Sequence, residues 1–484
     1  MSDLQPPTSR RAAREASKAP ASARVPAPVD PGDGSGPRLT PLQRGLIIGS
    51  GALIFVLLAT ASVFFGISVG RNTAITVPVP LPTGPTRATP ASIVQPTAIP
   101  TCSLDTLASA PALVKLYGSV VETASGNSLY ANNGTTAERP ASVLKVLTAA
   151  AALSVLGPTY QISTSVYAGH DPGTIVLVGE GDATLSRVSH SVYAGAPTLA
   201  SLASKAFAAY NADPDNAGVP ISHVVLDSTY WDPADNWDSS VPRSEQTGGY
   251  LSESTALQVD GDRANPTAQV SARSTDPVTA AGQYFVAALA ALPGGPDVST
   301  VTISKGAVEN GATTLGSVLS QPVSTLIRQM LAQSDNTLAE MLARIVSVKQ
   351  SLGGTGSSIQ QSTTTALGKY GLETSALTIE DGSGESDESL ITPQFMSKFM
   401  SLVSTKAFGL QYLAAGIPVV GKYSAKSGVI ATAYTLSGYT TAADGTGESF
   451  TFFAEGAGIK PAAQAALAAL ANAVYTCGKN ITNN

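Results

Sequence analysis

Side chains that bind metals are scarce in this sequence. Its 484 residues include only three histidines and two cysteines. None of the histidines, His170, His190 and His223, stands at a metal-ligand spacing from another histidine or from a cysteine. The sequence therefore predicts no zinc site, and nothing in it indicates a cofactor.

Positive charge is scarce after the first 44 residues. Residues 1–44 hold seven basic and four acidic residues, a net charge of +3. The remainder holds 21 basic and 30 acidic residues, a net charge of −9. This acidic balance argues against nucleic acid as a partner of the main body.

The N-terminal region divides into three segments by composition. Residues 1–44 are rich in Pro, Ala, Ser and Arg without apolar periodicity, which predicts a disordered basic tail. Residues 45–70 are 26 residues without a charge, long enough to span a bilayer, and the basic flank places the tail in the cytoplasm. Residues 71–101 are rich in Pro and Thr and predict an extended linker. We therefore expect a single-pass protein of the cell membrane with an extracytoplasmic main body.

A cleaved signal peptide is the alternative for residues 45–70. Ala59-Thr60-Ala61 resembles a small-residue processing site. However, the segment before the apolar run is unusually long for a signal peptide, and the run continues past that site to Val69. The pattern favours an uncleaved anchor.

The two cysteines, Cys102 and Cys477, bracket nearly all of the chain after the linker. In an oxidising compartment they predict one disulfide that ties together the ends of the folded region. Two unpaired thiols are the alternative.

Short β-rich runs and helical runs follow the linker. The predicted strands are 113–122, 129–131, 175–178, 223–226, 301–304, 423–435 and 450–454. The predicted helices are 141–156, 198–210, 278–292, two within 323–346, and 461–475. About 190 residues separate Ser142 from Ser334, more than a direct connection needs. Residues 160–312 are therefore predicted as a domain inserted into a catalytic domain of residues 102–159 and 313–484.

Ser142 and Lys145 begin the predicted helix 141–156 and share one of its faces. The unpaired N–H groups and the positive dipole at a helix N-terminus favour negative charge on the serine oxygen. The lysine can remove the serine proton only when neutral, which requires desolvation or a nearby cation such as Lys426. The pair predicts a nucleophile and its base. The alternative is a helix cap beside a solvated lysine.

Two later tripeptides supply partners for this pair. Ser334-Asp335-Asn336 falls between two apolar helical runs, where the alternative is a turn or an N-cap. Lys426-Ser427-Gly428 falls on a predicted strand, where the alternative is an exposed edge. Its small residues would let a substrate backbone lie alongside.

Together these motifs resemble the active-site set of the penicillin-recognising serine peptidases and β-lactamases. More narrowly, the chain is identified as a member of the D-alanyl-D-alanine carboxypeptidase/endopeptidase family, serine peptidase family S13 of the penicillin-binding protein 4 type. The resemblance covers most of residues 102–484. The stretches that carry it are Arg139-Pro-Ala-Ser142-Val-Leu-Lys145-Val-Leu-Thr148-Ala, Gly179-Glu-Gly-Asp182, Gln333-Ser-Asp-Asn336-Thr-Leu-Ala-Glu340, Asp381-Gly-Ser-Gly384, Lys426-Ser-Gly428 and Leu436-Ser-Gly-Tyr439.

The resemblance implies the catalytic roles. Ser142 would attack the carbonyl of a terminal D-Ala-D-Ala bond, with Lys145 as its general base. Ser334 would relay a proton toward the leaving group. An acyl-enzyme would form and be hydrolysed, and β-lactams would acylate the same serine but leave slowly.

The resemblance also implies the groups that bind the substrate. Asn336 would hold the substrate amide, and Lys426 and Ser427 would bind the terminal carboxylate. Gly428 is part of the same substrate-binding strand. The N–H of the next residue, Val429, would form the oxyanion hole together with the N–H of Ser142. The implied substrates are peptidoglycan stem peptides, and the balance between carboxypeptidase and endopeptidase activity stays open.

The fold that the resemblance implies is α+β. It is the β-lactamase/DD-peptidase-like transpeptidase fold, an antiparallel sheet flanked by helices, with an inserted β-rich domain and one preceding transmembrane helix. The insert is short for this family, so a reduced or missing subdomain is expected.

One stretch departs from the family pattern. After Asp381-Gly-Ser-Gly384 the family continues with an apolar residue and then Ser-Arg, whereas this chain has Glu385-Ser386-Asp387. An acid in place of a base there bears on the preference for substrate side chains. A second difference, Ser427 where many members have Thr, keeps the hydroxyl.

Two other functions share these motifs. A class A β-lactamase needs a deacylating glutamate, usually in Glu-x-x-Leu-Asn, and no Leu-Asn dipeptide occurs in the chain. A catalytically idle, cell-wall-binding scaffold would be expected to lose at least one motif residue, and all of them are present.

Overall fold

The computed structural model describes residues 101–482. The predicted tail at 1–44, the membrane segment at 45–70 and the linker at 71–101, apart from Thr101, lie outside the described residues. Within 101–482, no helix is long and apolar enough to cross a membrane.

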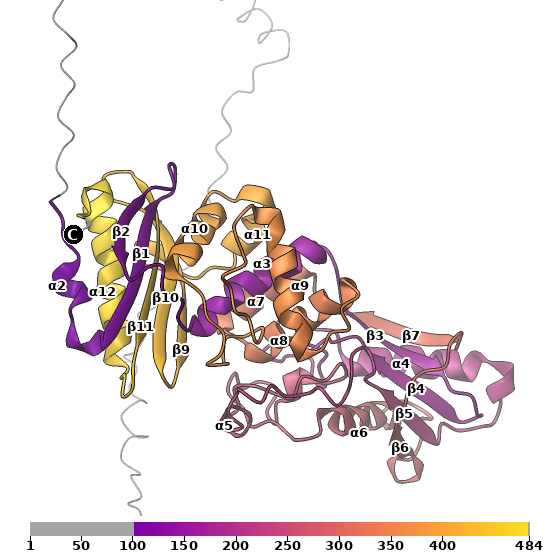
Figure 1. Cartoon of the computed structure of the whole chain (residues 1–484). Helices are drawn as coiled ribbons and strands as arrows, with labels where there is room; N and C mark the ends of the chain where they lie inside the picture. Colours follow the sequence, from indigo (N-terminus) through magenta and orange to yellow (C-terminus); the bar gives the residue numbers. More distant parts are fainter. Residues whose placement is uncertain (1–100, 483–484) are drawn as a thin grey trace, which may run out of the picture. The chain divides into compact units, whose positions relative to one another are not determined.

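A six-stranded antiparallel sheet forms one part of the fold (Figure 1). Its strands, in spatial order, are β2 (Ser128–Asn132), β1 (Lys115–Glu122), β11 (Gly447–Glu455), β10 (Ala433–Thr441), β9 (Tyr423–Ile430) and β8 (Val419–Val420). The first two strands therefore pair with the last ones, because β1 lies beside β11 along its whole length. This pairing brings the two ends of the described chain together.

Both faces of this sheet are covered, so its central strand β11 is apolar on both sides. Phe450 and Phe452 pack with the C-terminal helix α12 (Ala462–Cys477), whereas Phe453 points into the helical core on the other face. The alternation follows from the two-residue period of a strand. Each of these fully buried rings stabilises the fold by about 1.5–3 kcal/mol.

Helices cover the second face of the sheet and form the largest core. They are α3 (Lys145–Val155), α7 (Val323–Gln333), α8 (Asn336–Lys349), α9 (Ile359–Leu367), α10 (Pro393–Ser404) and α11 (Gln411–Ala414). In Figure 1, α3 lies among α7, α8 and α9, and α10 lies against the sheet. Helix α3 is buried on every side over most of its length, which explains why its sequence is rich in Ala and Leu.

A second, mixed sheet has the strand order β6, β5, β4, β3, β7. The bounds are β3 (Ser163–Ala168), β4 (Thr174–Gly179), β5 (His223–Asp227), β6 (Thr302–Lys305) and β7 (Thr314–Leu319). Strands β4, β5 and β6 run parallel, and β3 is antiparallel to both of its neighbours. Helices α4 (Leu199–Ala212) and α6 (Pro277–Ala290) pack on it around a separate apolar core. The short helices α2 (Asp105–Ala108) and α5 (Ser244–Thr247) complete the described elements longer than one 3₁₀ turn.

The α+β class and the helix-flanked antiparallel sheet are thus confirmed, with two corrections in detail. The predicted strand 423–435 is two strands, because the chain turns at residues 431–432 between β9 and β10. Residues 313–319 were predicted in the catalytic domain, but β7 pairs with β3 and belongs to the second sheet. The predicted domain boundary at residue 312 does not account for this pairing, because β7 and β3 are far apart in the sequence.

Cys102 and Cys477 form the predicted disulfide, with Cα atoms 5.6 Å apart. Cys102 also pairs with the segment after α12, since its backbone N–H donates to the carbonyl of Asn480. The start of the described chain is therefore fixed to the end of α12.

Candidate active site

Ser142 lies in a short 3₁₀ helix, η2 (Ala141–Leu144), that leads directly into α3. The predicted helix 141–156 is therefore present, but its first turn is tighter than an α-helix. Ala141 has a φ of +45°, which is uncommon for a residue with a side chain. Its neighbour in space, Gly384, has a φ of +80°, and a Cβ there would collide with the carbonyl oxygen of Ala141. The nucleophile's turn and the 381–384 stretch are thus packed backbone against backbone.

Lys145 is fully buried, and its Nζ lies 2.7 Å from Oγ of Ser142. The same amine donates a hydrogen bond of 2.7 Å to the carbonyl oxygen of Ser383. Burial lowers the pKa of Lys145 below its ordinary value, although the carboxylates of Glu385 and Asp381 oppose this shift. The lysine is therefore poised toward the neutral form that can accept a proton.

Asp381 organises the loop that carries Ser383. Its carboxylate accepts hydrogen bonds from the hydroxyls of Ser383 and Ser389 and from the backbone N–H of Glu385. The backbone N–H of Gly382 donates to the carboxylate of Glu340 in α8. These bonds fix the loop that presents a carbonyl to the lysine.

Ser334, Asp335 and Asn336 form the junction between α7 and α8. Ser334 ends α7 in the left-handed conformation, with a φ of +55°. Asp335 caps α8 by accepting from the backbone N–H of Leu338 at 2.9 Å, so the capping alternative holds for this one residue. Its capping leaves the hydroxyl of Ser334 and the amide of Asn336 to line a cavity.

Arg263 contacts Asp335 from the other side. In the sequence, Arg263 comes between strands β5 and β6 of the second sheet. The guanidinium bonds to the Asp335 carboxylate at 2.7 Å, and both side chains are nearly completely buried. The hydroxyl of Tyr193 donates to the same carboxylate at 3.0 Å. Burial acts to raise the pKa of Asp335, but Arg263 and the Leu338 N–H outweigh it, so the pKa is lowered.

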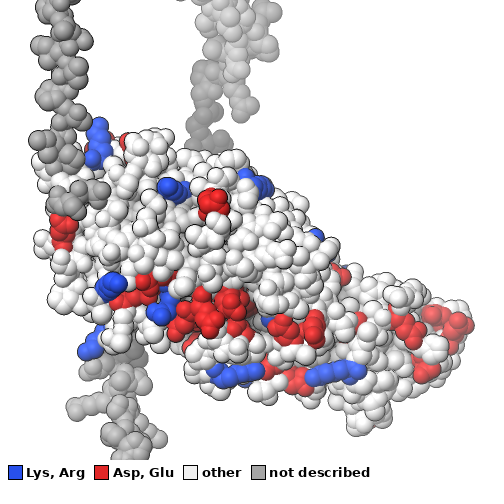
Figure 2. Space-filling model, viewed as in Figure 1, with Lys and Arg blue, Asp and Glu red and all other residues white. Residues whose placement is uncertain are grey.

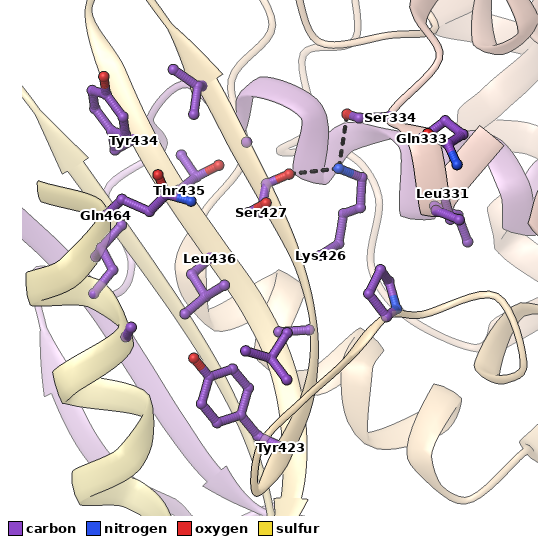
Figure 3. Close-up of a pocket in the computed structure, with 18 residues that line it drawn as sticks. Leu331, Gln333, Ser334, Tyr423, Lys426, Ser427, Tyr434, Thr435, Leu436 and Gln464 are labelled. Atoms are coloured by element: carbon purple, nitrogen blue, oxygen red, sulfur yellow. Dashed lines mark hydrogen bonds between the residues drawn. The ribbon is translucent and has the colours of Figure 1, made fainter. Parts of the chain in front are cut away.

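Lys426 on β9 points toward Ser334 (Figure 3). Its Nζ lies 2.9 Å from Oγ of Ser334 and donates a hydrogen bond of 2.6 Å to the carbonyl oxygen of Ser427. Burial and, to a smaller extent, the nearby amine of Lys145 lower the pKa of Lys426 to about 7, although the carboxylate of Glu385 opposes this shift. The side chain is 3% exposed, so the alternative of an edge lysine in solvent is wrong.

Gly428 lets strand β9 pass close to the nucleophile. A Cβ at this position would lie 2.6 Å from the backbone nitrogen of Ser142 and would collide with the hydroxyl of Thr435. That hydroxyl donates a hydrogen bond of 2.7 Å to the carbonyl of Pro140, which fixes the turn before the nucleophile. The next residue, Val429, lines a cavity together with Ser142, and the N–H groups of these two residues are the predicted oxyanion hole.

Residues of all three motifs line one cavity of about 290 Å³. The predicted site residues that line this cavity are Ser142, Ser334, Asn336, Ser427, Gly428 and Val429. A second cavity of about 260 Å³, drawn in Figure 3, shares Ser334, Ser427 and Gly428 with the first and adds Lys426. The structure therefore brings together three motifs that are far apart in sequence. Across residues 101–482, no group of three His, Cys, Asp or Glu side chains is arranged to hold a metal ion.

The sequence profile of the D-Ala-D-Ala carboxypeptidase 3 (S13) family matches residues 101–269 and 196–474. The chain belongs to this family. The carboxypeptidase DacB of Mycolicibacterium smegmatis is 29% identical over 466 residues, which cover 88% of this chain and 95% of the relative. A carboxypeptidase of Mycobacterium tuberculosis is 28% identical over 474 residues, covering 90% of this chain and 97% of the relative.

Solved structures show the same fold. The crystal structure of penicillin binding protein 4 from Haemophilus influenzae matches with a TM-score of 0.60 at 18% identity, covering 75% of this chain and 96% of that protein. A second structure of that protein, in complex with a β-lactam, matches with a TM-score of 0.56, the same identity and the same coverage. As a member of a peptidase family, this chain is a hydrolase.

Sequence reasoning overlooked several residues that line this cavity and come from distant segments. Tyr250, Arg263, Gln269 and Arg273 line the cavity from the part of the chain between β5 and β6. Their spacing in the sequence matches no known motif, so no local pattern could have identified them.

Glu385 also lines the cavity, and its carboxylate accepts a hydrogen bond of 2.8 Å from the Asn336 amide. An adjoining cavity of about 490 Å³ is lined by Glu245, Glu385 and Asp387 together with apolar residues. Figure 2 shows that Asp and Glu side chains gather in the middle of the face that it presents. The departure from the family pattern at Glu385 thus lies inside the site.

Proposed function

We propose that this S13 peptidase is a serine-type D-Ala-D-Ala carboxypeptidase that acts on peptidoglycan stem peptides through an acyl-enzyme on Ser142. The observation that carries the proposal is the 2.7 Å contact between Oγ of Ser142 and Nζ of a fully buried Lys145. A buried amine beside a hydroxyl serves as a general base because desolvation favours its neutral form.

The acylation step uses both lysines. Lys145 takes the proton of Ser142 as Oγ bonds to the carbonyl carbon of the scissile peptide. The N–H groups of Ser142 and Val429 stabilise the negative charge that develops on the carbonyl oxygen. Ser334, in contact with Lys426, passes a proton to the leaving amine, and D-alanine departs.

Substrate binding uses the other motif residues. The amide of Asn336 holds the peptide backbone of the substrate. Lys426 and Ser427 bind the terminal carboxylate, which restores the positive charge on Lys426 by raising its lowered pKa. A β-lactam would acylate the same serine, in line with the β-lactam complex of the structural relative.

We also propose that residues 45–70 anchor the enzyme in the cell membrane with the peptidase outside. The uncharged run of 26 residues and its basic N-terminal flank support this arrangement. Membrane fractions of producing cells should retain the full chain after a high-salt wash. Release of the full chain into the soluble fraction would exclude the anchor.

The test of the activity is the intact mass of the full chain before and after benzylpenicillin. Wild-type protein should gain the mass of one penicilloyl group and should release D-alanine from a peptide ending in D-Ala-D-Ala. Ser142→Ala should do neither, whereas Ser375→Ala, at an exposed turn, should behave as wild type. A folded wild-type protein with no adduct and no D-alanine release would reject the proposal in favour of an idle scaffold.

A further inference from the structure

Glu385 places a carboxylate at the acylation site. It lines the same cavity as Ser142, Ser334 and Asn336. Its Oε1 accepts a hydrogen bond of 2.8 Å from Nδ2 of Asn336, the amide assigned above to the substrate. Its backbone N–H is held by Asp381, so the loop fixes the position of the side chain.

The carboxylate of Glu385 forms no ion pair with the residues that the structure describes. The cavity has one other acidic residue among its lining side chains, Asp335, which is neutralised by Arg263. Within residues 101–482, Glu385 forms no salt bridge, and Oε1 is its one carboxylate oxygen with a hydrogen bond from the protein. Oε2 therefore remains to accept a proton from a water molecule.

Asn336 supplies a second polar atom at the same place. Its Oδ1 is buried and has no hydrogen-bond partner among the described residues, although the side chain as a whole is 5% exposed. A buried acceptor without a partner is costly unless a ligand or a water satisfies it. A water held by Asn336 and Glu385 would lie within the cavity that also contains the acylated serine.

We propose that Glu385 is the general base of deacylation, and that the enzyme thereby hydrolyses β-lactams as well as peptides. This inference rests on the proposed acyl-enzyme at Ser142. Glu385 takes a proton from the water as the water oxygen bonds to the acyl carbon. The bond from that carbon to Oγ of Ser142 then breaks, and Oγ takes up the proton held on Glu385. The acid product leaves, and both residues return to their starting state.

The electrostatics of the site agree with this role. Burial raises the pKa of Glu385 to about 7, and the amine of Lys145 acts in the opposite direction. A general base works best when its pKa lies near the working pH. The charged groups that act on Glu385 are Lys145, Glu245 and Asp381, with Lys426 on the facing strand. A glutamate is the accepted deacylation residue of class A β-lactamases, which reach it by a different motif.

The test is to measure the acylation and deacylation of the full chain by benzylpenicillin separately. Acylation is followed by stopped flow, and deacylation by the decay of the adduct mass after excess β-lactam is removed. Glu385→Gln keeps the size and an acceptor for Asn336 but cannot take a proton. Acylation should stay within about twofold of wild type, whereas deacylation should fall by about 100-fold or more.

Glu388→Gln is the matched control, because Glu388 is an exposed acid of the same loop. It should acylate and deacylate as wild type does. Formate added to Glu385→Ala should restore part of the lost deacylation, which a merely structural role would not allow. Equal adduct decay in wild type and Glu385→Gln, or parallel losses in both steps, would overturn the inference and leave the proposed function standing. If wild type forms no adduct, hydrolyses no benzylpenicillin and releases no D-alanine, both proposals are rejected.

Discussion

The backbone carbonyl oxygen of Ser383 accepts a hydrogen bond of 2.7 Å from Nζ of Lys145. A neutral amine has two N–H donors and one lone pair. When one N–H is committed to Ser383, the lone pair can be directed at the hydroxyl of Ser142, 2.7 Å away. The Asp381-Gly-Ser-Gly384 loop therefore orients the base, although it lies more than 230 residues after it in the chain.

Lys145→Arg should slow acylation strongly, because a guanidinium stays protonated and cannot take the serine proton. A general base contributes about 10² to 10⁴ in rate, and we expect a loss in that range in the acylation rate with benzylpenicillin. For wild type, the lowered pKa of Lys145 means that acylation should slow as the pH falls and the amine becomes protonated. Lys398→Arg, on the exposed face of α10, should leave the rate unchanged. Acylation by Lys145→Arg at the wild-type rate would exclude Lys145 as the base.

Lys426 should make substrate binding depend on pH. Its pKa of about 7 in the free enzyme means that the cation required by a terminal carboxylate is lost as the pH rises above 7. The KM of a peptide with a free carboxylate should therefore rise by up to about tenfold per pH unit between pH 7 and 9. The same peptide capped as a carboxamide is the control, and its KM should not follow this rise. Equal pH profiles for the two peptides would remove Lys426 from carboxylate binding.

Gly428→Ala should block acylation without unfolding the protein. The added Cβ would lie 2.6 Å from the nitrogen of Ser142, so β9 must move away from the oxyanion hole. Loss of one oxyanion donor costs about 10² to 10³ in rate, which is the expected fall in acylation. Gly447→Ala on β11 is the control, since its Cβ would have its nearest neighbour at 3.4 Å. Wild-type acylation by Gly428→Ala would show that this close approach is unnecessary.

Local patterns were sufficient to predict the centre of the site. The apolar spacing of 141–156 predicted a helix, and the three-residue separation placed Lys145 beside Ser142, as the structure shows. The junction at 334–336 was likewise visible as a polar tripeptide between two apolar periods. These features depend on residues that are close in sequence, where helix periodicity is informative.

Contacts between distant segments could not be predicted in this way. The sequence marked Glu385 as a departure from the family, but its bond to Asn336 depends on how the loop packs against α8. Arg263 carried no motif, and its partner Asp335 lies 72 residues later in the chain. The burial that lowers the pKa of Lys426 is also a product of the whole fold. Such properties arise from tertiary packing and leave no periodic signal.

Arg263→Met should destabilise the protein strongly, because it leaves Asp335 buried and without its counter-ion. Removing one partner of a buried pair costs about 3–5 kcal/mol. The pKa of Asp335 is lowered in the fold, so its stabilising contribution is present above the unfolded pKa of about 3.9 and is lost as the pH falls. Denaturant unfolding of wild type and variant at pH 7 and pH 3 should show a smaller difference at the lower pH.

Lys305→Met is the control for Arg263→Met. The Lys305–Asp276 pair has a similar distance, 2.8 Å, but its side chains are about half exposed. An exposed pair contributes about 0–1 kcal/mol. Equal effects of the two substitutions would contradict a structural role for the buried pair.

The disulfide between Cys102 and Cys477 should stabilise the fold by restricting the unfolded chain. It closes a loop across a sequence separation of 375 residues and ties the segment before α2 to the end of α12. Native disulfides contribute about 2–5 kcal/mol, so Cys102→Ala with Cys477→Ala should lower the unfolding temperature measurably. The active-site cavity is lined by neither cysteine, so acylation by benzylpenicillin at 25 °C should persist. Reductant should lower the unfolding temperature of wild type toward that of the double variant and leave the variant unchanged. If reductant shifts the two proteins equally, the stabilisation does not come from this bond.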